Sequence, residues 1–371
     1  MLSWVEIKRK NILHNLRVFK GLVGEGAELV PVIKANAYGH GSKEIAKICL
    51  ESGLVTWLAV AGLDEAFQLR LSRIASKILV LSFYELDPAL IDKAIGVKIR
   101  FCLYTPEQAR FLAARARKLG KKAYVHVKID TGTSRVGVLP GPKTLRWVAD
   151  LQRSPEFKLE GLWSHFSSSE ENPKITQQQY DCFEQFNQEL AQHHIAIPFR
   201  HMACSASILG FPQSHFNMAR LGLGLYGLYP AVGLKKYADL RPVLSWHARV
   251  IQVKKLPAGV KISYGGTFTT KQPTILAILP VGYSDGYDRR FSNRAEVLIR
   301  GQRAAVLGRV CMNLTMIDVT AIKGVKAGDT VVLLGGHEKD RISVEELAAL
   351  AGTINYEIVA RINPLLPRVI T

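Results

Sequence analysis

The sequence predicts an α/β protein: a (β/α)8 TIM-like barrel over residues 1–238, followed by a mostly antiparallel β domain over residues 239–371. Two observations favour this fold class. Up to about residue 235, short apolar runs alternate with longer stretches of helical period, which is typical of βαβ units and a parallel sheet. From about residue 240, β-branched runs are broken by glycines every few residues, which is typical of antiparallel strands and tight turns.

The barrel strands are predicted from apolar runs separated by helical stretches. In order they are ELVPVIK, TWLAVAG, KILVLSF, VKIRFCLY, AYVHVKID, LEGLWSHF, a weaker FRHMACS and NMARLGLGLYGL. In the helix TPEQARFLAARARKLG, Thr105 is the predicted N-cap, Pro106 the first helical residue and Gln108 the partner that completes a capping box. Eight strands that close on themselves form a barrel, whose functional groups gather on the loops after the strand ends.

The β domain is predicted from six runs and one helix. The runs are WHARVIQVKKL, TILAILPVGY, AEVLIRG, RAAVLGRV, LTMIDVT and DTVVLLGG. The helix extends from Ser343 to Ala351, and Ser343 and Glu346 form a second predicted capping box.

The composition indicates a large hydrophobic core and no targeting segment. The chain has 371 residues, 48% of them hydrophobic, and no apolar run reaches transmembrane length. We therefore expect a cytoplasmic protein without a membrane partner. The five cysteines are scattered and never form a C-x-x-C pair, so neither a disulfide framework nor a metal site is expected.

The formal net charge of +18 raises the alternative of nucleic-acid binding. The basic residues are, however, spread along the chain. One cluster, RARKLGKK at residues 115–122, is typical of the solvated end of a helix, and no pattern of a known nucleic-acid-binding motif accompanies it. We therefore expect no nucleic-acid partner.

The stretch VIKANAYGHG contains the main candidate for catalysis. An apolar strand from Leu29 to Ile33 places Lys34 at its carboxyl end, and a glycine-rich turn with Tyr38 follows. A desolvated lysine has a lowered pKa and becomes a nucleophile. The alternative is an ordinary strand-end lysine that extends into solvent.

Further polar residues fall after other predicted strands. They are Lys128, Arg135, His165, Ser205 and Arg220. In ARLGLGLYGL the backbone N–H groups near Gly222 and Gly224 can bind a phosphate, although glycines that allow tight packing are an equal alternative. A nucleophilic lysine and a glycine-rich segment, without metal-ligand spacing, suit a phosphorylated carbonyl cofactor.

Motifs along nearly the whole chain resemble those of the alanine racemase family. They are VIKANAYGHG, KIDTGTSRVG, SHF, FNMARLGLGLYG, ISYGGTF, VGYSDGYDRR, GRVCMNLTMIDV and TINYE. The resemblance implies a β/α barrel with a β domain, pyridoxal 5′-phosphate (PLP) as the cofactor, and interconversion of L- and D-alanine. It also implies a homodimer with shared active sites and a supply of D-alanine for peptidoglycan.

The resemblance implies a role for each catalytic candidate. Lys34 would hold PLP as a Schiff base and then move a proton on one face of the substrate Cα. Tyr264 would serve the opposite face. Because a phenol with a pKa of about 10 is a poor base at neutral pH, it would need help from His165. Arg220 would lie against the pyridine nitrogen and disfavour transamination.

The resemblance also implies the binding residues. Those for the cofactor phosphate are Tyr38, Ser205, the backbone of Gly222 and Leu223, and Tyr356. Those for the substrate carboxylate are Arg135 and the backbone N–H of Met312. Lys128 would brace Arg135, as a carbamate in some relatives; the alternative is an ordinary lysine paired with Asp130.

Four positions depart from the common family pattern. Cys204 stands where many relatives have asparagine, and Asn313 where aspartate is usual. Thr133 and Ser134 stand where methionine and glycine are common. These positions fall near the substrate end of the site, so they bear on substrate range.

Three other functions are alternatives. A broad-spectrum amino-acid racemase would share all the motifs. A non-catalytic PLP-binding homeostasis protein would share the barrel and the lysine but lacks the β domain, and hence Tyr264. A PLP decarboxylase would need a cysteine as a proton donor, for which Cys311 is the candidate. Because Tyr356 is bulky, the sequence predicts a preference for alanine over larger substrates.

Overall fold

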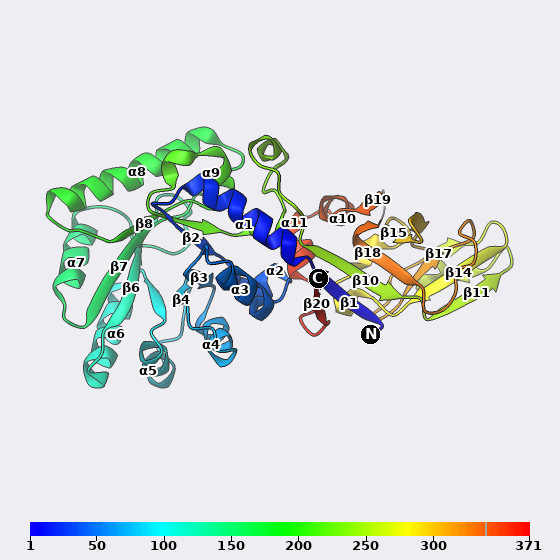
Figure 1. Cartoon of the computed structure of the whole chain (residues 1–371), viewed down its shortest axis with the longest axis horizontal. Helices are drawn as coiled ribbons and strands as arrows, with labels where there is room; N and C mark the ends of the chain where they lie inside the picture. Colours follow the sequence, from blue (N-terminus) through cyan, green and yellow to red (C-terminus); the bar gives the residue numbers. More distant parts are fainter. Residues whose placement is uncertain (338–339) are drawn as a thin grey trace. The chain divides into compact units, whose positions relative to one another are not determined.

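The computed structural model describes residues 1–337 and 340–371, which divide into two compact units (Figure 1). The barrel unit comprises Asn11–Ala35 and Ser42–Pro242, and the β unit comprises Met1–Lys10, Asn36–Gly41 and Val243–Thr371. Residues 1–10, which the sequence placed at the start of the barrel range, lie in the β unit. The reason is that β1 (Ser3–Ile7) pairs with two strands of that unit.

All residues of the barrel unit are described, and eight parallel strands form its centre. They are β2 (Glu28–Pro31), β3 (Trp57–Val60), β4 (Lys77–Val80), β5 (Arg100–Leu103), β6 (Ala123–Lys128), β7 (Phe157–Trp163), β8 (Phe199–His201) and β9 (Met218–Leu221). Strands β3 to β8 form one sheet in sequence order, and β2 pairs with β9. A bridge between Val32 and Ala59 joins β2 to β3, and a hydrogen bond from Arg220 N–H to Ala203 O joins β9 to the end of β8. The predicted barrel is confirmed.

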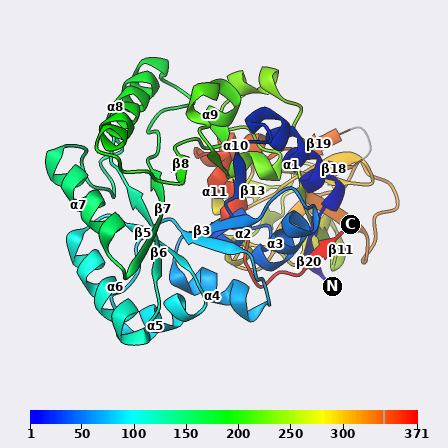
Figure 2. The same cartoon turned by 60° about the vertical axis from the view of Figure 1, so that its left-hand side comes forward.

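Helices follow most of the barrel strands and cover the outside of the sheet β3–β8 (Figure 2). The α-helices are α1 (Arg9–Val23), α3 (Ser42–Glu51), α4 (Leu63–Leu71), α5 (Pro88–Gly96), α6 (Pro106–Leu119), α7 (Pro142–Arg153), α8 (Pro173–Gln192) and α9 (Ser205–Gly210). Short 3-10 helices follow as η1 (Pro212–Ser214), η2 (Leu223–Tyr226) and η3 (Val232–Tyr237). Every residue of β3 and of β5 is buried, as expected for parallel strands covered on both faces.

The β unit contains mainly antiparallel strands. They are β1, β10 (Leu244–Arg249), β11 (Gln252–Leu256), β12 (Lys261–Ile262), β13 (Phe268–Thr269), β14 (Thr274–Leu279), β15 (Glu296–Ile299), β16 (Gln302–Ala305), β17 (Thr315–Asp318), β18 (Thr330–His337), β19 (Asp340–Ile342) and β20 (Arg368–Ile370). The largest sheet has the order β16-β15-β18-β10-β1-β20, with β19 paired to β18. The pairing of β1 with β20 is parallel. The predicted β domain is confirmed.

Helices and 3-10 turns complete the β unit. They are α10 (Val344–Ala351), α11 (Asn355–Ala360), η4 (Tyr264–Gly266), η5 (Tyr283–Asp285) and η6 (Arg289–Phe291). Among the described residues of the chain, no helix is both long and apolar enough to cross a membrane.

The two predicted N-caps are confirmed, but their reciprocal caps are not formed. Thr105 Oγ1 accepts a hydrogen bond from Gln108 N–H, and Ser343 Oγ accepts one from Glu346 N–H. Gln108 Oε1 instead accepts from Tyr104 N–H. The Glu346 carboxylate accepts from the Arg303 guanidinium, since a charged donor forms a stronger hydrogen bond than a backbone N–H.

Candidate active site

Lys34 lies directly after the first barrel strand, as the sequence predicted. Backbone pairing continues beyond β2, because Ile33 N–H donates to Ala59 O of β3 at 2.8 Å. Lys34 is half-buried. Burial and the charge of Arg135 lower the pKa of Lys34, while Glu65 opposes the shift. The side chain therefore holds its proton less tightly than an exposed lysine does.

The turn after Lys34 is helical but left-handed, which the sequence did not predict. In α2 (Lys34–Tyr38) the φ angles of Ala35, Asn36, Ala37 and Tyr38 are 51°, 54°, 53° and 53°. Each non-glycine residue in this region costs roughly 1–2 kcal/mol. His40 Nδ1 lies 3.0 Å from Ala37 O and 2.8 Å from Tyr38 O, so the imidazole closes the turn.

Glu65 of α4 holds the start of this turn. One carboxylate oxygen accepts from Ala35 N–H at 2.5 Å, and the other accepts from Ala61 N–H at 2.7 Å. Glu65 was not among the predicted site residues. Its only sequence signal was an acidic residue in the first turn of a helix after a barrel strand.

Arg220 of β9 is buried and makes five hydrogen bonds within the barrel unit. Nη1 donates to His201 Nδ1 at 2.7 Å and to His201 O at 3.1 Å. Nη2 donates to Ser164 O at 2.8 Å, to Met202 O at 3.0 Å and to His165 Nδ1 at 3.1 Å. Burial lowers the pKa of Arg220 to about 10, so the guanidinium remains charged at neutral pH.

His165 lies among the predicted cationic residues. Burial holds its pKa well below the usual range, with further contributions from the charges of Arg220, Arg135, Lys128 and Lys34. The imidazole is therefore neutral. Because Nδ1 accepts a hydrogen bond from Arg220, the ring proton lies on Nε2.

Lys128 of β6 is also buried among cations. Its Nζ lies 4.6 Å from the centre of the Trp163 ring, and the Arg220 guanidinium carbon lies 4.7 Å from the same ring. Burial, with contributions from Arg135 and Arg220, lowers the pKa of Lys128 to about 8. Part of the population of Lys128 is therefore neutral near physiological pH.

The loop that carries Arg135 is organised by Asp130. Its Oδ1 accepts hydrogen bonds from the backbone of Gly132, Thr133 and Ser134 and from Thr133 Oγ1. Burial alone would raise the pKa of Asp130, but these bonds lower it below the usual value. Ser134 has φ 50°, a conformation that favours glycine, so this departure from the family pattern carries backbone strain.

The turn after β9 joins Ser205 to the glycine-rich segment. Ser205 is buried, and its Oγ accepts from Gly222 N–H at 3.0 Å and from Gly224 N–H at 3.1 Å. Leu223 lies between these two amides. Because both amides donate to the hydroxyl oxygen, the Ser205 proton is directed towards another acceptor.

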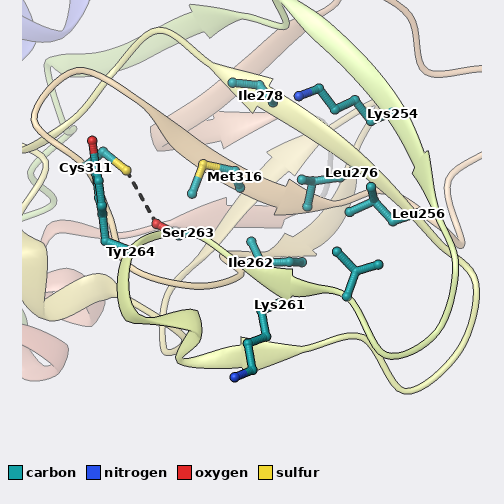
Figure 3. Close-up of a pocket in the computed structure, with 11 residues that line it drawn as sticks. Lys254, Leu256, Lys261, Ile262, Ser263, Tyr264, Leu276, Ile278, Cys311 and Met316 are labelled. Atoms are coloured by element: carbon teal, nitrogen blue, oxygen red, sulfur yellow. Dashed lines mark hydrogen bonds between the residues drawn. The ribbon is translucent and has the colours of Figure 1, made fainter.

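Tyr264 lies in the β unit and is 72% exposed. It stands at the end of a cavity of ≈ 440 Å³ with apolar walls from Leu256, Leu276 and other residues of the unit. Figure 3 shows Tyr264 beside Cys311 and Ser263 at one end of this cavity. Ser263 Oγ donates to Arg309 O at 2.6 Å, which fixes the backbone just before the tyrosine.

Met312 and Asn313 lie on one exposed segment of the β unit. Ser284 Oγ donates to Met312 O at 2.8 Å and accepts from Asn313 Nδ2 at 2.8 Å. Asn313 thus takes part in a hydrogen-bonded connection to the Met312 backbone. An aspartate could not donate to Ser284 in this way.

Tyr38 and Tyr356 also lie together in the β unit. Their ring centres are 6.2 Å apart, and both side chains are half-buried. Tyr356 is on α11, whereas Tyr38 ends the left-handed turn. The structure therefore brings together two of the predicted phosphate-binding residues.

The predicted site residues fall into two sets. Those in the barrel unit are Lys34, Lys128, Arg135, His165, Ser205, Arg220, Gly222 and Leu223; those in the β unit are Tyr38, Tyr264, Met312 and Tyr356. Sequence reasoning missed two buried residues, His201 and His126. Arg220 is hydrogen-bonded to His201, and His201 is hydrogen-bonded to His126. The sequence offered one signal for these residues: each of two predicted barrel strands contains a histidine among apolar residues.

The barrel residues suit PLP by the chemistry of their donors. The set contains a lysine amine of lowered pKa, a buried arginine, and a hydroxyl next to backbone amides at a strand end. An amine can bond to an aldehyde, and the hydroxyl and amides can bind a phosphate. The fold and these residues define a PLP-dependent enzyme of the barrel type.

Comparisons with known proteins agree with this class. "Alanine racemase, N-terminal domain" matches residues 7–230, and "Alanine racemase, C-terminal domain" matches residues 243–370. A relative from Caldanaerobacter subterraneus subsp. tengcongensis, alanine racemase 2, is 38% identical over 98% of this chain and 94% of its own length. The chain belongs to the alanine racemase family.

Solved structures show the same fold. The alanine racemase of Clostridium difficile 630 has a TM-score of 0.95 and 34% identity, over 100% of this chain and 96% of its own. A histidine racemase from Leuconostoc mesenteroides subsp. sake has a TM-score of 0.92 and 27% identity, over 100% and 98% of the two chains. PLP is the cofactor of the alanine racemase family.

Proposed function

We propose that this protein is a PLP-dependent alanine racemase that interconverts L- and D-alanine through two bases, Lys34 and Tyr264. The observation that carries the proposal is the strand-end Lys34, whose pKa is lowered by burial and by Arg135, in a chain of this family. The product D-alanine would serve peptidoglycan synthesis. Because peptidoglycan precursors are built in the cytoplasm, we place the enzyme there.

Lys34 is proposed as the cofactor lysine and as the base on one face of the substrate. When bound, PLP supplies an aldehyde that bonds to amino groups and withdraws electrons from the substrate Cα. The lowered pKa of Lys34 supports its role, because a neutral amine can both attack a carbonyl and take a proton from Cα.

Tyr264 is proposed as the base on the opposite face, with His165 as its partner. The His165 ring is neutral and carries its proton on Nε2, which can donate to a phenolate oxygen. This would stabilise the tyrosine anion that a proton transfer from Cα requires. Tyr264 belongs to the β unit and is largely exposed, which supports its presentation to another chain.

Arg220 is proposed to face the pyridine nitrogen of PLP. A permanent cation there keeps the nitrogen unprotonated and limits the spread of charge into the ring, which disfavours transamination. Its hydrogen bonds to three backbone carbonyls and two histidines support this role, because they fix the guanidinium in one orientation.

The remaining predicted residues are proposed to bind the two anionic groups. The phosphate would be bound by Ser205, the backbone of Gly222 and Leu223, Tyr38 and Tyr356. Two distances support this set: Ser205 Oγ lies 3.0 Å from the Gly222 nitrogen, and the ring centres of the two tyrosines are 6.2 Å apart. On binding, the Gly222 N–H would turn from Ser205 to the phosphate. The substrate carboxylate would be bound by Arg135 and by the Met312 N–H, which lies in a segment connected by Ser284.

Lys128 is proposed to be carbamylated. The reaction joins its neutral amine to CO2 and releases a proton, and a pKa of about 8 leaves enough neutral amine for this. A negative carbamate would also offset the charges of Arg135 and Arg220. The alternative pairing with Asp130 is not favoured, because no ion pair between the two is found among the described residues and Asp130 Oδ1 binds its own loop.

A homodimer is proposed in which the β unit of one copy completes the barrel site of the other. In this arrangement residues 1–238 bind PLP, and residues 239–371 contribute the second base. Mixing inactive variants, described below, tests the arrangement.

A broad-spectrum racemase is the second candidate, and the likeness to a histidine racemase keeps larger substrates relevant. The test is direct. The purified protein is expected to be yellow, to bleach with borohydride and to racemise L-alanine, and Lys34→Ala should lose all three properties. A colourless protein without racemisation would contradict the proposal. A rate for histidine or lysine equal to that for alanine would favour the second candidate.

A further inference from the structure

A chain of buried polar side chains extends from Arg220 through the interior of the barrel. His201 Nδ1 lies 2.7 Å from Arg220 Nη1, and His201 Nε2 lies 2.9 Å from His126 Nδ1. His126 Nε2 lies 3.9 Å from Glu160 Oε2, which is also 3.1 Å from Arg100 Nε. We propose that Glu160, His126 and His201 are positioning residues that hold Arg220 in its working orientation, an inference that rests on the role of Arg220 proposed above.

The direction of each hydrogen bond in this series of side chains follows from Arg220, where the series begins. A guanidinium has only donors, so His201 Nδ1 must offer a lone pair to Arg220. A neutral His201 then carries its proton on Nε2 and donates it to His126 Nδ1. His126 in turn carries its proton on Nε2, which faces the Glu160 carboxylate. Only one pair of tautomers satisfies these contacts.

The electrostatics agree with two neutral rings. Burial, with Arg100 and Arg220, lowers the pKa of His126 to about 3, and burial, with Arg220 and His126, holds the pKa of His201 well below its usual value. Each ring then points its lone pair towards Arg220 and its N–H towards Glu160. The two ring dipoles are aligned between a cation and an anion, which stabilises both charges.

Arg220 has no carboxylate in direct contact among the residues that the structure describes. The closest connection to a negative charge that its hydrogen bonds provide is through the two rings to Glu160. At the far end, the gap of 3.9 Å is beyond hydrogen-bond distance, so the dipole of the neutral His126 ring, and not a hydrogen bond, interacts with the Glu160 carboxylate. Arg100 Nε donates to Glu160 Oε2 at 3.1 Å, so a cation lies next to this carboxylate.

The local structure of β7 supports a specific arrangement of these side chains. Leu159 pairs with Val125 and Gly161 pairs with His126, so the register shift leaves Glu160 as the extra residue of a β-bulge. The bulged residue is buried in the barrel unit. A Cβ at Gly161 would lie 2.1 Å from His126 Nδ1, the atom that accepts from His201. Glycine is therefore required at this position for the ring to lie where it does.

The first experiment reads the tautomers directly by nitrogen NMR of the PLP-loaded protein labelled in histidine. At neutral pH we expect His201 and His126 each to show an unprotonated Nδ1 and a protonated Nε2. Signals are assigned by their loss in His201→Gln and His126→Gln. A proton on either Nδ1, or a doubly protonated ring, would overturn the proposal. This measurement does not depend on racemisation, so it remains decisive if the protein proves to have another activity.

The second experiment separates positioning from packing. His126→Gln retains an oxygen that can accept from His201 and an amide that can face Glu160, whereas His126→Leu has neither. We expect His126→Leu to shift the guanidinium nitrogen signals of Arg220 and to raise transamination relative to racemisation roughly tenfold, the effect of losing the buried hydrogen bond between His126 and His201. His126→Gln should restore both properties to near wild type.

Phe101→Leu is the matched control, because Phe101 is fully buried in β5 and takes no part in the series of polar side chains from Arg220 to Glu160. It should lower thermal stability without moving the Arg220 signals or the reaction ratio. Equal behaviour of His126→Leu and Phe101→Leu would show that the histidine only fills space and would overturn the proposal. If His126→Leu does not fold, Glu160→Gln replaces it. We expect Glu160→Gln to shift the nitrogen signals of His126, and unchanged signals would contradict the proposal.

Discussion

Exchanging Lys128 for methionine removes a buried amine and keeps a side chain of similar length. The pKa of about 8 means that, near pH 7.5, about a quarter of Lys128 is neutral, against about one in a thousand for a lysine with the ordinary pKa of 10.5. Since only the neutral amine reacts with CO2, a far larger share of Lys128 than of an exposed lysine is available for carbamate formation. Near pH 6 the neutral share falls to about 1%, so the modification should diminish.

The assay is carbon NMR of the protein equilibrated with labelled bicarbonate. We expect a carbamate signal in the wild type near pH 8 that weakens as the pH falls and that is absent in Lys128→Met. Lys122→Met, which changes an exposed lysine, is the control and should keep the signal. Because Lys128 would act through Arg135, Lys128→Met should raise the KM for alanine roughly tenfold and change kcat much less. No signal at pH 8, or a signal that survives in Lys128→Met, would refute the reasoning.

Three further changes test the other proposed roles. Mixing Lys34→Ala subunits with Tyr264→Phe subunits should restore one intact site per heterodimer; proven subunit exchange without any recovered activity would rule out the shared site. Arg220→Glu should let the pyridine nitrogen hold a proton and raise transamination relative to racemisation, and an unchanged ratio would remove Arg220 from this role. Tyr356→Asn should widen the substrate range towards serine; equal specificity constants for alanine and lysine in the wild type would show that Tyr356 does not limit substrate size.

The sequence predicted the elements that local patterns determine. Apolar runs predicted all eight barrel strands, and Thr105 and Ser343 were correct as N-caps because capping depends on residues close in sequence. Lys34 was placed at its strand end for the same reason. The pairing of β1 with β10 was not predicted, since it joins residues more than two hundred positions apart.

Other parts of the site had no local signal. The left-handed turn after Lys34 consists of ordinary residues, and nothing in the letters of Ala35 or Ala37 indicates a positive φ. The chain from Arg220 to Glu160 depends on strand register and on one bulge, both of which are set by tertiary packing. The alternation of side chains in a regular strand would have placed Glu160 and Gly161 on opposite faces, and it gives no sign of the bulge.

The β unit takes its residues from three separate stretches of the chain, 1–10, 36–41 and 243–371. A hybrid protein made by a single crossover near residue 242 would therefore combine β1 and the turn after Lys34 from one parent with β10, β20 and α11 from the other. Strand β1 pairs with both β10 and β20, so the mismatch would affect both neighbours of β1 in the sheet. Recombination within this family should therefore preserve function only when the three stretches are inherited together.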